Sequence, residues 1–282
     1  MSDDLAQFRH RLHREPEVGL YLPRTQEKVL AELDGLPLEI TTGDALSSVT
    51  AVLRGHRPGP TVLLRGVDYA AAGPQMHACG HDLHTTMLVG AARLLAANTH
   101  RFDGAVVLMF QPGEESDNGA GYMLAEGVLD ASGQRPVAAY AMHAVSAGTA
   151  HGVFTTRRGP MLAAGDVLSV TVHGPGGHGS EPHRAKDPIL AACAMVSALQ
   201  VTVTRQFDVF DPVVITVGTG AFVLLGACAP GADPESAANN HSPAAVFDDG
   251  VLADGAALYT ELALRRPAAR PVVEEVVSAE QA

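Results

Sequence analysis

Ala105-Val-Val-Leu-Met-Phe110 is a continuous apolar run that leads directly into Gln111-Pro-Gly-Glu-Glu115. A strand that is apolar on both faces is typical of the centre of a sheet covered on both sides. The two carboxylates after it would lie just beyond the carboxyl end of that strand. Open α/β sheets collect their chemistry at this edge. The run therefore predicts a buried central strand followed by a functional loop.

Strand and helix patterns alternate on both sides of this run. Short stretches of apolar and β-branched residues predict strands at 47–54, 61–65 and 137–143. Apolar residues at helical spacing predict helices at 3–14, 24–34, 82–97, 119–127 and 249–265. Because strands and helices alternate in this way, we expect an α/β fold with a mixed sheet covered by helices on both faces.

Residues 165–220 form a separate pattern inside this fold. They predict a strand at 167–173, a long helix at 187–206 and a strand at 212–217. A strand at 222–225 then returns to the main pattern. We therefore expect an inserted α+β domain at 165–220 and a main domain made of 1–164 and 221–266. The tail 267–282 is expected to be disordered.

Composition narrows the class of protein and its surroundings. The 282 residues carry a formal net charge of −12 without a dense Lys/Arg cluster, which argues against nucleic-acid and membrane partners. No apolar run reaches the length of a membrane span, and Met1-Ser-Asp-Asp4 is too acidic for a signal peptide. The three cysteines are far apart, so a disulfide framework is not expected. A cytoplasmic location fits these features.

Side chains that bind metals recur at separated points of the chain. Met76-His-Ala-Cys-Gly-His-Asp-Leu-His84 holds three histidines, a cysteine and an aspartate, and Glu114, Glu115, His143 and His241 follow. Thiolate, imidazole and carboxylate bind zinc and its neighbours. A carboxylate beside such a site can act as general base. This pattern predicts a metal-dependent amide hydrolase or a shortened relative of one.

Two residues of this segment allow further interpretations. Cys79 could act as a nucleophile in a Cys–His pair, although Glu114 and Glu115 would then have no role. His84 is expected on the helix after the motif, where it could support the metal site from outside the ligand shell.

Five motifs in the same order resemble the zinc-dependent aminoacylase and carboxypeptidase-type metallopeptidase family. The closest branch is the N-acyl-amino-acid amidohydrolases, which include hippurate hydrolases and auxin-conjugate hydrolases. The resemblance runs along nearly the whole chain. The motifs are His10-Arg-Leu-His-Arg-Glu-Pro-Glu-Val-Gly19, His77-Ala-Cys-Gly-His-Asp82, Gln111-Pro-Gly-Glu-Glu115, Gly176-Gly-His-Gly-Ser-Glu-Pro-His183 and His241-Ser-Pro243.

The resemblance implies a site with two adjacent divalent metal ions. Zinc is the expected metal, and the family also uses manganese, cobalt or nickel. Glu114 matches the general base, and His178 matches a lid histidine that steadies the oxyanion. The substrate would be a small N-acyl amino acid, and 165–220 would be a truncated lid that can form a homodimer. The implied metal ligands are Cys79, His81, Glu115, His143 and His241.

The sequence departs from the family pattern at two places. After Val62-Leu-Leu-Arg-Gly66 the family's Asp-Met-Asp motif is missing, although Asp68 could supply its last aspartate in a shifted register. After Val214-Ile-Thr-Val-Gly-Thr219 the second half of the lid is missing. That half normally carries an Asn and an Arg that hold the substrate carboxylate, and a Gly-Ser-Glu-Asp motif. Two alternatives to an active enzyme therefore stay open, a catalytically impaired metal-binding homologue and an incomplete chain.

Overall fold

The structure is a computed structural model that describes residues 2–68, 76–115, 117–157, 172–174, 188–195, 198, 220–240, 242 and 244–265. The chain divides into two compact units, one of Met1–Thr156 with Thr219–Ala282 and one of Arg157–Gly218. In the second unit residues 188–195 are helical, within the predicted helix. The strands predicted at 167–173 and 212–217 lie largely or wholly outside the described residues, as does the tail 267–282. The boundaries of the inserted domain stay a prediction.

The described part of the first unit contains one seven-stranded mixed sheet, in the order β1-β2-β4-β3-β5-β7-β6. The inner strands β4, β3, β5 and β7 run parallel, so their carboxyl ends meet at one edge. The outer pairings of β1 with β2, β2 with β4 and β6 with β7 are antiparallel. The strands are β1 Leu38–Thr42, β2 Val49–Arg54, β3 Thr61–Asp68, β4 Ala105–Pro112, β5 Pro136–Val145, β6 Phe154–Thr155 and β7 Gly220–Gly226.

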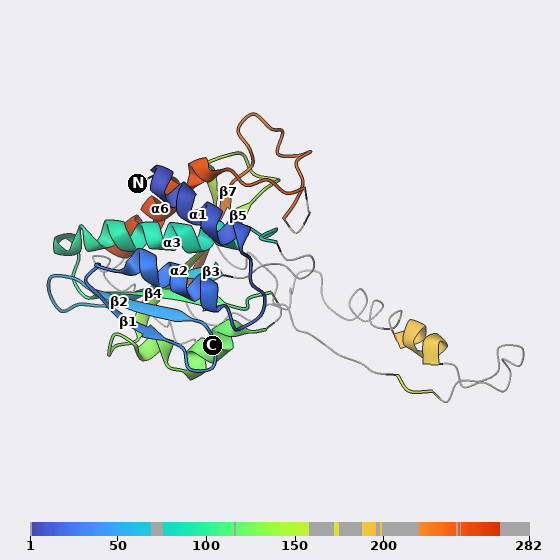
Figure 1. The fold of residues 1–282 in the computed structure, drawn as a ribbon, viewed down its shortest axis with the longest axis horizontal. Helices are drawn as coiled ribbons and strands as arrows, with labels where there is room; N and C mark the ends of the chain where they lie inside the picture. Colours follow the sequence, from blue (N-terminus) through green and yellow to red (C-terminus); the bar gives the residue numbers. More distant parts are fainter. Residues whose placement is uncertain are drawn as a thin grey trace, which may run out of the picture. The chain divides into compact units, whose positions relative to one another are not determined.

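Helices cover both faces of this sheet, as predicted (Figure 1). One face carries α1 Ser2–Arg14, α2 Pro23–Leu33, α3 His81–Ala96 and α6 Leu252–Arg265. The other carries α4 Gly119–Ala125 and the 3-10 turn η2 Val128–Asp130. Two further 3-10 turns are η1 Thr99–Arg101 and η4 Asp249–Val251.

Strand β4 shows why both faces are apolar. Val106, Leu108 and Phe110 belong to the larger core under the four helices, whereas Val107 and Met109 belong to the smaller core on the α4 side. Successive side chains of a strand point to opposite faces, so a strand that contributes to two cores must be apolar throughout. The prediction of a buried central strand is confirmed.

The other predicted elements of the main domain are present with small shifts at their ends. His143 was expected to end its strand but lies within β5, which continues to Val145. The strands β1 and β6 were not predicted, because β1 is a mostly exposed edge strand and β6 has only two residues. No helix within the described residues is long and apolar enough to cross a membrane.

Candidate metal centre

The sheet opens between β3 and β5, near the carboxyl ends of its parallel strands. The two strands pair as far as Arg65 and Ala141. Beyond that point the hydroxyl of Tyr259 donates to the carbonyl oxygen of Arg65 at 2.6 Å and accepts from the amide of Met142 at 3.1 Å. These bonds satisfy buried backbone groups that a neighbouring strand would otherwise satisfy. The chain moves from β3 to β4 on one side and later to β5 on the other, which makes this gap the switch point where α/β sheets bind ligands.

Cys79 and His81 lie at the turn that begins α3, beside this gap. Gly80 between them has a φ of +80°, and a Cβ there would come within 2.9 Å of the Phe247 ring. Only glycine adopts this turn without strain and without a clash. The turn therefore places the buried thiol of Cys79 and the buried imidazole of His81 at the start of the helix.

Five of the predicted site residues come together here. The Sγ atom of Cys79 lies 3.4 Å from Nε2 of His143, and Nε2 of His81 lies 3.7 Å from a carboxylate oxygen of Glu114 and 3.7 Å from one of Glu115. Ligand-type atoms of Cys79, His81 and His143 all lie within 4.8 Å of one another, and so do those of His81, Glu114 and Glu115. His81 belongs to both groups.

The other two predicted site residues, His178 and His241, lie outside the described residues. The neighbours of His241 are described, and Asn240 donates to the carbonyl oxygens of Cys79 and Ala144 at 3.2 and 2.9 Å. Asp68 is the last residue of β3, and nothing is described of its side chain. Its possible role in a shifted register stays a prediction.

The hydrogen bonds of two imidazoles indicate their tautomers. His143 places Nδ1 2.7 Å from the carbonyl oxygen of Ala144, so Nδ1 carries a proton and donates, and Nε2 faces Sγ of Cys79. His84 accepts the amide of Ala144 on Nε2 at 2.9 Å. Burial, together with the nearby imidazoles of His143 and His81, lowers the pKa of His84. His84 is thus a neutral support of the β5 backbone, beside the ligand-type residues.

The chemistry of this donor set fits a divalent metal. Burial and the negative charges of Glu115 and Glu114 raise the pKa of the Cys79 thiol. A divalent cation would reverse this effect because it stabilises the thiolate and neutralises the carboxylates. A thiol, two imidazoles and carboxylates are the ligands that zinc and related metals take in proteins. The residues present therefore fit the metal type that the sequence predicts.

Asp82 ties the N-terminal helix to this turn, a role that sequence reasoning missed. The Oδ2 atom of this fully buried carboxylate accepts from Nε of Arg9 at 3.0 Å and from Nδ1 of His13 at 2.8 Å. Burial by itself would raise the pKa of Asp82, but the His13 hydrogen bond and the Arg9 charge outweigh it and lower the pKa. The four-residue spacing of Arg9 and His13, which puts both on one helix face, is the signal that sequence holds.

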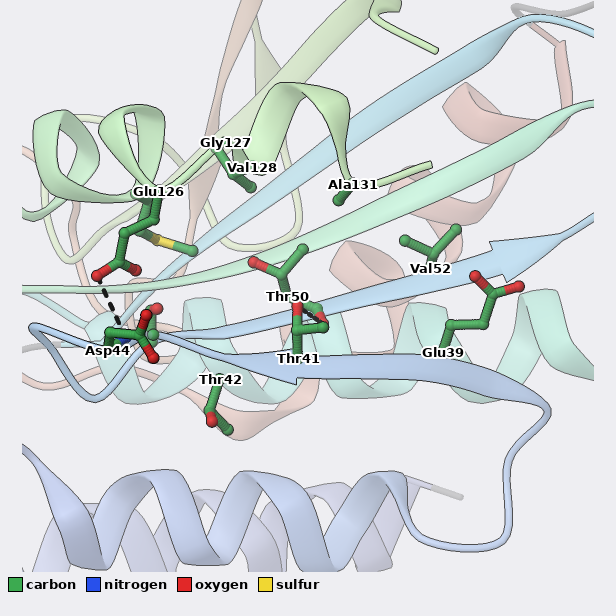
Figure 2. Close-up of a pocket in the computed structure, with 13 residues that line it drawn as sticks. Glu39, Thr41, Thr42, Asp44, Thr50, Val52, Glu126, Gly127, Val128 and Ala131 are labelled. Atoms are coloured by element: carbon green, nitrogen blue, oxygen red, sulfur yellow. Dashed lines mark hydrogen bonds between the residues drawn. The ribbon is translucent and has the colours of Figure 1, made fainter. Parts of the chain in front are cut away.

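A separate hollow lies between the β1–β2 side of the sheet and the α4–η2 segment (Figure 2). Its volume is about 320 Å³, and it is open to solvent. Two of its three carboxylates are engaged in the fold. Glu126 accepts from the amides of Asp44 and Ala45 at 3.2 and 2.9 Å, and Glu39 accepts from Arg54 at 2.8 and 2.9 Å. None of the lining residues is a predicted ligand, so the hollow adds nothing to the metal centre.

The fold and the cluster define an α/β protein with a metal-type site at the carboxyl ends of its parallel strands. Residues 60–265 match the model of Peptidase family M20/M25/M40. This match covers more than half of the chain, and the chain belongs to that family. The resemblance that the five motifs carry is therefore confirmed.

Similar proteins with assigned names support the family assignment. Thermostable carboxypeptidase 2 of Saccharolobus solfataricus is 35% identical over 235 residues, which cover 78% of this chain and 58% of the relative. IAA-amino acid hydrolase ILR1-like 4 of Arabidopsis thaliana is 37% identical over 241 residues, 79% of this chain and 53% of the relative. Hippurate hydrolase of Campylobacter jejuni is 34% identical over 232 residues, which cover 77% of this chain and 59% of the relative. The chain thus matches little more than half the length of these relatives.

Solved structures share the fold at low sequence identity. A candidate aminohydrolase of methicillin-resistant Staphylococcus aureus superposes with a TM-score of 0.74 at 20% identity, covering 94% of this chain and 97% of that one. The YXEP protein of Bacillus subtilis is described as a dinuclear metal binding peptidase of the M20 family. It superposes with a TM-score of 0.67 at 20% identity, covering 93% of this chain and 97% of that one. At this identity the comparison concerns the fold alone.

Proposed function

We propose that this protein is a metal-dependent amidohydrolase that cleaves N-acyl amino acids into a carboxylate and a free amino acid. The observation that carries the proposal is the convergence of a thiol, two imidazoles and two carboxylates at the ends of parallel strands. The names of the relatives support the substrate class, because hippurate and IAA-amino acid conjugates are both acylated amino acids.

The proposed centre holds two divalent ions, with zinc as the first candidate and manganese, cobalt or nickel as alternatives. When bound, the ions would polarise the scissile carbonyl and lower the pKa of the attacking water. The proposed ligands are Cys79, His81, Glu115, His143 and His241. The first four come from the turn that begins α3, the loop after β4 and strand β5.

Glu114 is the proposed general base. Its side chain is 39% exposed and one oxygen lies 3.7 Å from Nε2 of His81, so the carboxylate borders both the cluster and solvent. In that place it can take the proton of the attacking water and pass it to the leaving amine. His178, in the inserted segment, is the proposed donor to the tetrahedral oxyanion.

The inserted domain at 165–220 is also the proposed surface of a homodimer, and the cytoplasm is the proposed location. Sedimentation equilibrium of the purified chain measures its oligomeric state directly. A monomer at every concentration up to the solubility limit would contradict the dimer and leave the hydrolytic site untouched.

A second candidate is a catalytically impaired homologue that binds metal without turnover. It is favoured by the short match, 53–59% of the length of the three relatives. It is also favoured by the missing lid segment, which in the family carries two residues that hold the substrate. An incomplete chain of an active enzyme is the third reading of the same observations.

Hydrolysis of a panel of N-acetyl and N-benzoyl amino acids tests these candidates. The chain is stripped with a chelator, reloaded with zinc, manganese or cobalt, and assayed by release of free amino acid. Hydrolysis that requires metal supports the enzyme, and a folded, metal-bound chain without hydrolysis supports the impaired homologue. A chain that does not fold supports the incomplete-chain reading. A folded chain that binds no metal contradicts the proposal and the impaired homologue.

A further inference from the structure

Among the described residues, no strand pairs with the end of β5 on the side of β3 beyond Arg65 and Ala141. On its other side β5 pairs with β7 up to Val145, whose carbonyl oxygen also accepts the amide of Ala227. Backbone groups of successive strand residues point to alternate sides, so those of Met142, Ala144 and Ser146 point toward the gap. Tyr259 and His84 accept the first two amides of this series.

The side chain of Asn240 makes the next hydrogen bonds to β5, beyond the point where pairing with β3 ends. Its Nδ2 donates to the carbonyl oxygen of Ala144 at 2.9 Å, and its Oδ1 accepts the amide of Ser146 at 2.8 Å. In a parallel ladder one residue donates to a carbonyl of the neighbouring strand and accepts the amide two residues further on. The carboxamide of Asn240 reproduces this pattern and stands in for a strand residue.

The orientation of this carboxamide is determined by its partners. The carbonyl oxygen of Ala144 can only accept and the amide of Ser146 can only donate, so the nitrogen and oxygen of Asn240 have one consistent assignment. The hydroxyl of Ser146 lies 2.7 Å from the carbonyl oxygen of Ala238 and 2.9 Å from Oδ1, so its single proton is shared between these two acceptors. The backbone amide of Ser146 therefore keeps the NH₂ group of Asn240 turned toward the cluster.

The same NH₂ group reaches both sides of the metal-type cluster. It lies 3.2 Å from the carbonyl oxygen and 3.9 Å from Sγ of Cys79. The carbonyl of Ala144 that it binds also accepts Nδ1 of His143, which leaves Nε2 of His143 facing Cys79. One side chain thus connects the turn of Cys79 with the strand of His143.

We propose that Asn240 is a positioning residue that fixes Cys79 and His143 as a preformed half of the metal centre. The inference rests on the proposed function, because it takes these two residues as metal ligands. Partners that orient metal ligands from outside the ligand shell typically contribute about 10- to 100-fold to metal affinity. Asn240 acts through Cys79 and His143 and needs no contact with substrate.

Titration of the metal-free full chain with cobalt(II) tests this inference without any assay of turnover. Asn240→Asp keeps the size and the oxygen that Ser146 binds, but it places a second acceptor against the carbonyl oxygens of Cys79 and Ala144. Asn239→Asp is the matched control, since this exposed neighbour undergoes the same change in charge. Two quantities are read, the dissociation constant for cobalt and the thiolate-to-cobalt charge-transfer absorption that reports ligation by Cys79.

Asn240→Asp is expected to weaken cobalt binding by about 10- to 100-fold and to reduce the charge-transfer band, while Asn239→Asp matches the wild type. Ser146→Ala removes the hydroxyl that contacts Ala238 and Asn240 but keeps the amide that Oδ1 accepts, so a smaller loss of cobalt affinity is expected. This variant tests the inference if Asn240→Asp does not fold. Wild-type affinity and a wild-type band in the folded variants would overturn the inference and leave the proposed function intact. A wild-type chain that binds no cobalt would overturn both.

Discussion

At the scale of single residues, Tyr259 determines how the sheet can open without leaving buried backbone groups unsatisfied. Its ring is fully buried on α6, and burial raises the pKa of its hydroxyl, which therefore keeps its proton. The hydroxyl joins Arg65 of β3 to Met142 of β5 at the point where the ladder ends. The gap that holds the candidate metal centre depends on this bridge.

Replacing Tyr259 with Phe removes the bridge and leaves a buried carbonyl and a buried amide without their partner. We expect the free energy of unfolding to fall by about 1–3 kcal/mol, the usual cost of an unsatisfied buried group. Urea denaturation measures it. Tyr21→Phe is the control, because Tyr21 is 76% exposed and should change stability by less than about 0.5 kcal/mol. Equal values for the two variants would contradict the role of the bridge.

At the scale of elements, helix α2 is capped by a residue from outside its own first turn. The N-cap position is Leu22, which has no side-chain oxygen to offer, and Pro23 follows it. Glu17 caps the helix instead. One of its carboxylate oxygens accepts from the amide of Thr25 at 2.8 Å, and the other accepts from Nε of Arg24 at 3.1 Å. Burial raises the pKa of Glu17, but these hydrogen bonds outweigh it, and the net shift is downward.

A lowered pKa in the folded state makes this cap dependent on pH. The stabilisation is present above the unfolded pKa, about 4.3, and is lost as the pH falls through the folded value. Glu17→Gln should lose about 1 kcal/mol of stability at neutral pH, the usual contribution of a cap. The difference from wild type should shrink as the pH falls below about 4.3 and vanish once the pH is below the folded pKa. Glu27→Gln, at an exposed site on the same helix, is the control. A difference that does not vary with pH would contradict an ionic cap.

The contact between α3 and α6 is close because Gly90 has no side chain. A Cβ at Gly90 would lie 2.7 Å from Cβ of Ala256 and 3.0 Å from a methyl of Leu5. Gly90→Ala gains about 1 kcal/mol of helix propensity but overpacks the core at about 1–3 kcal/mol. We expect a net loss in thermal unfolding experiments. The loss should shrink in an Ala256→Gly background, and an equal loss in both backgrounds would show that the two sites are not coupled.

Elements with a strong periodic signal could be predicted from the sequence, and contacts across the gap could not. The apolar run of β4 and the helical pattern of α3 identify buried elements directly. The meeting of Cys79, His81, Glu114, Glu115 and His143 follows from parallel strand ends. The bridges made by Tyr259 and Asn240 depend on where β3 and β5 part, which no local pattern records. The exposed edge strand β1 gives no burial pattern to detect.

At the scale of the whole molecule, the metal centre would hold distant parts of the chain together. Its described ligand candidates come from the turn that begins α3, the loop after β4 and strand β5. Only the folded chain brings these side chains within reach of one ion. Metal binding should therefore stabilise the folded state, by about 2.7 kcal/mol when the free metal is 100 times its dissociation constant.

Thermal unfolding with and without zinc checks this coupling. Zinc should raise the melting temperature of the wild type, and a chelator should reverse the rise. Cys79→Ser should lose most of the zinc effect, whereas Cys193→Ser, which changes an exposed free thiol, should keep it. A zinc effect that survives in Cys79→Ser would place the metal elsewhere.

The most direct test of the central claim compares two adjacent glutamates that are given different roles. Glu114→Gln and Glu115→Gln make the same chemical change, and each is assayed for bound zinc and for hydrolysis of N-acyl amino acids. Glu114→Gln should keep its zinc and lose about 10²- to 10⁴-fold in turnover, whereas Glu115→Gln should lose metal affinity as well. Wild-type turnover in Glu114→Gln, or unchanged zinc binding in Glu115→Gln, would contradict the account.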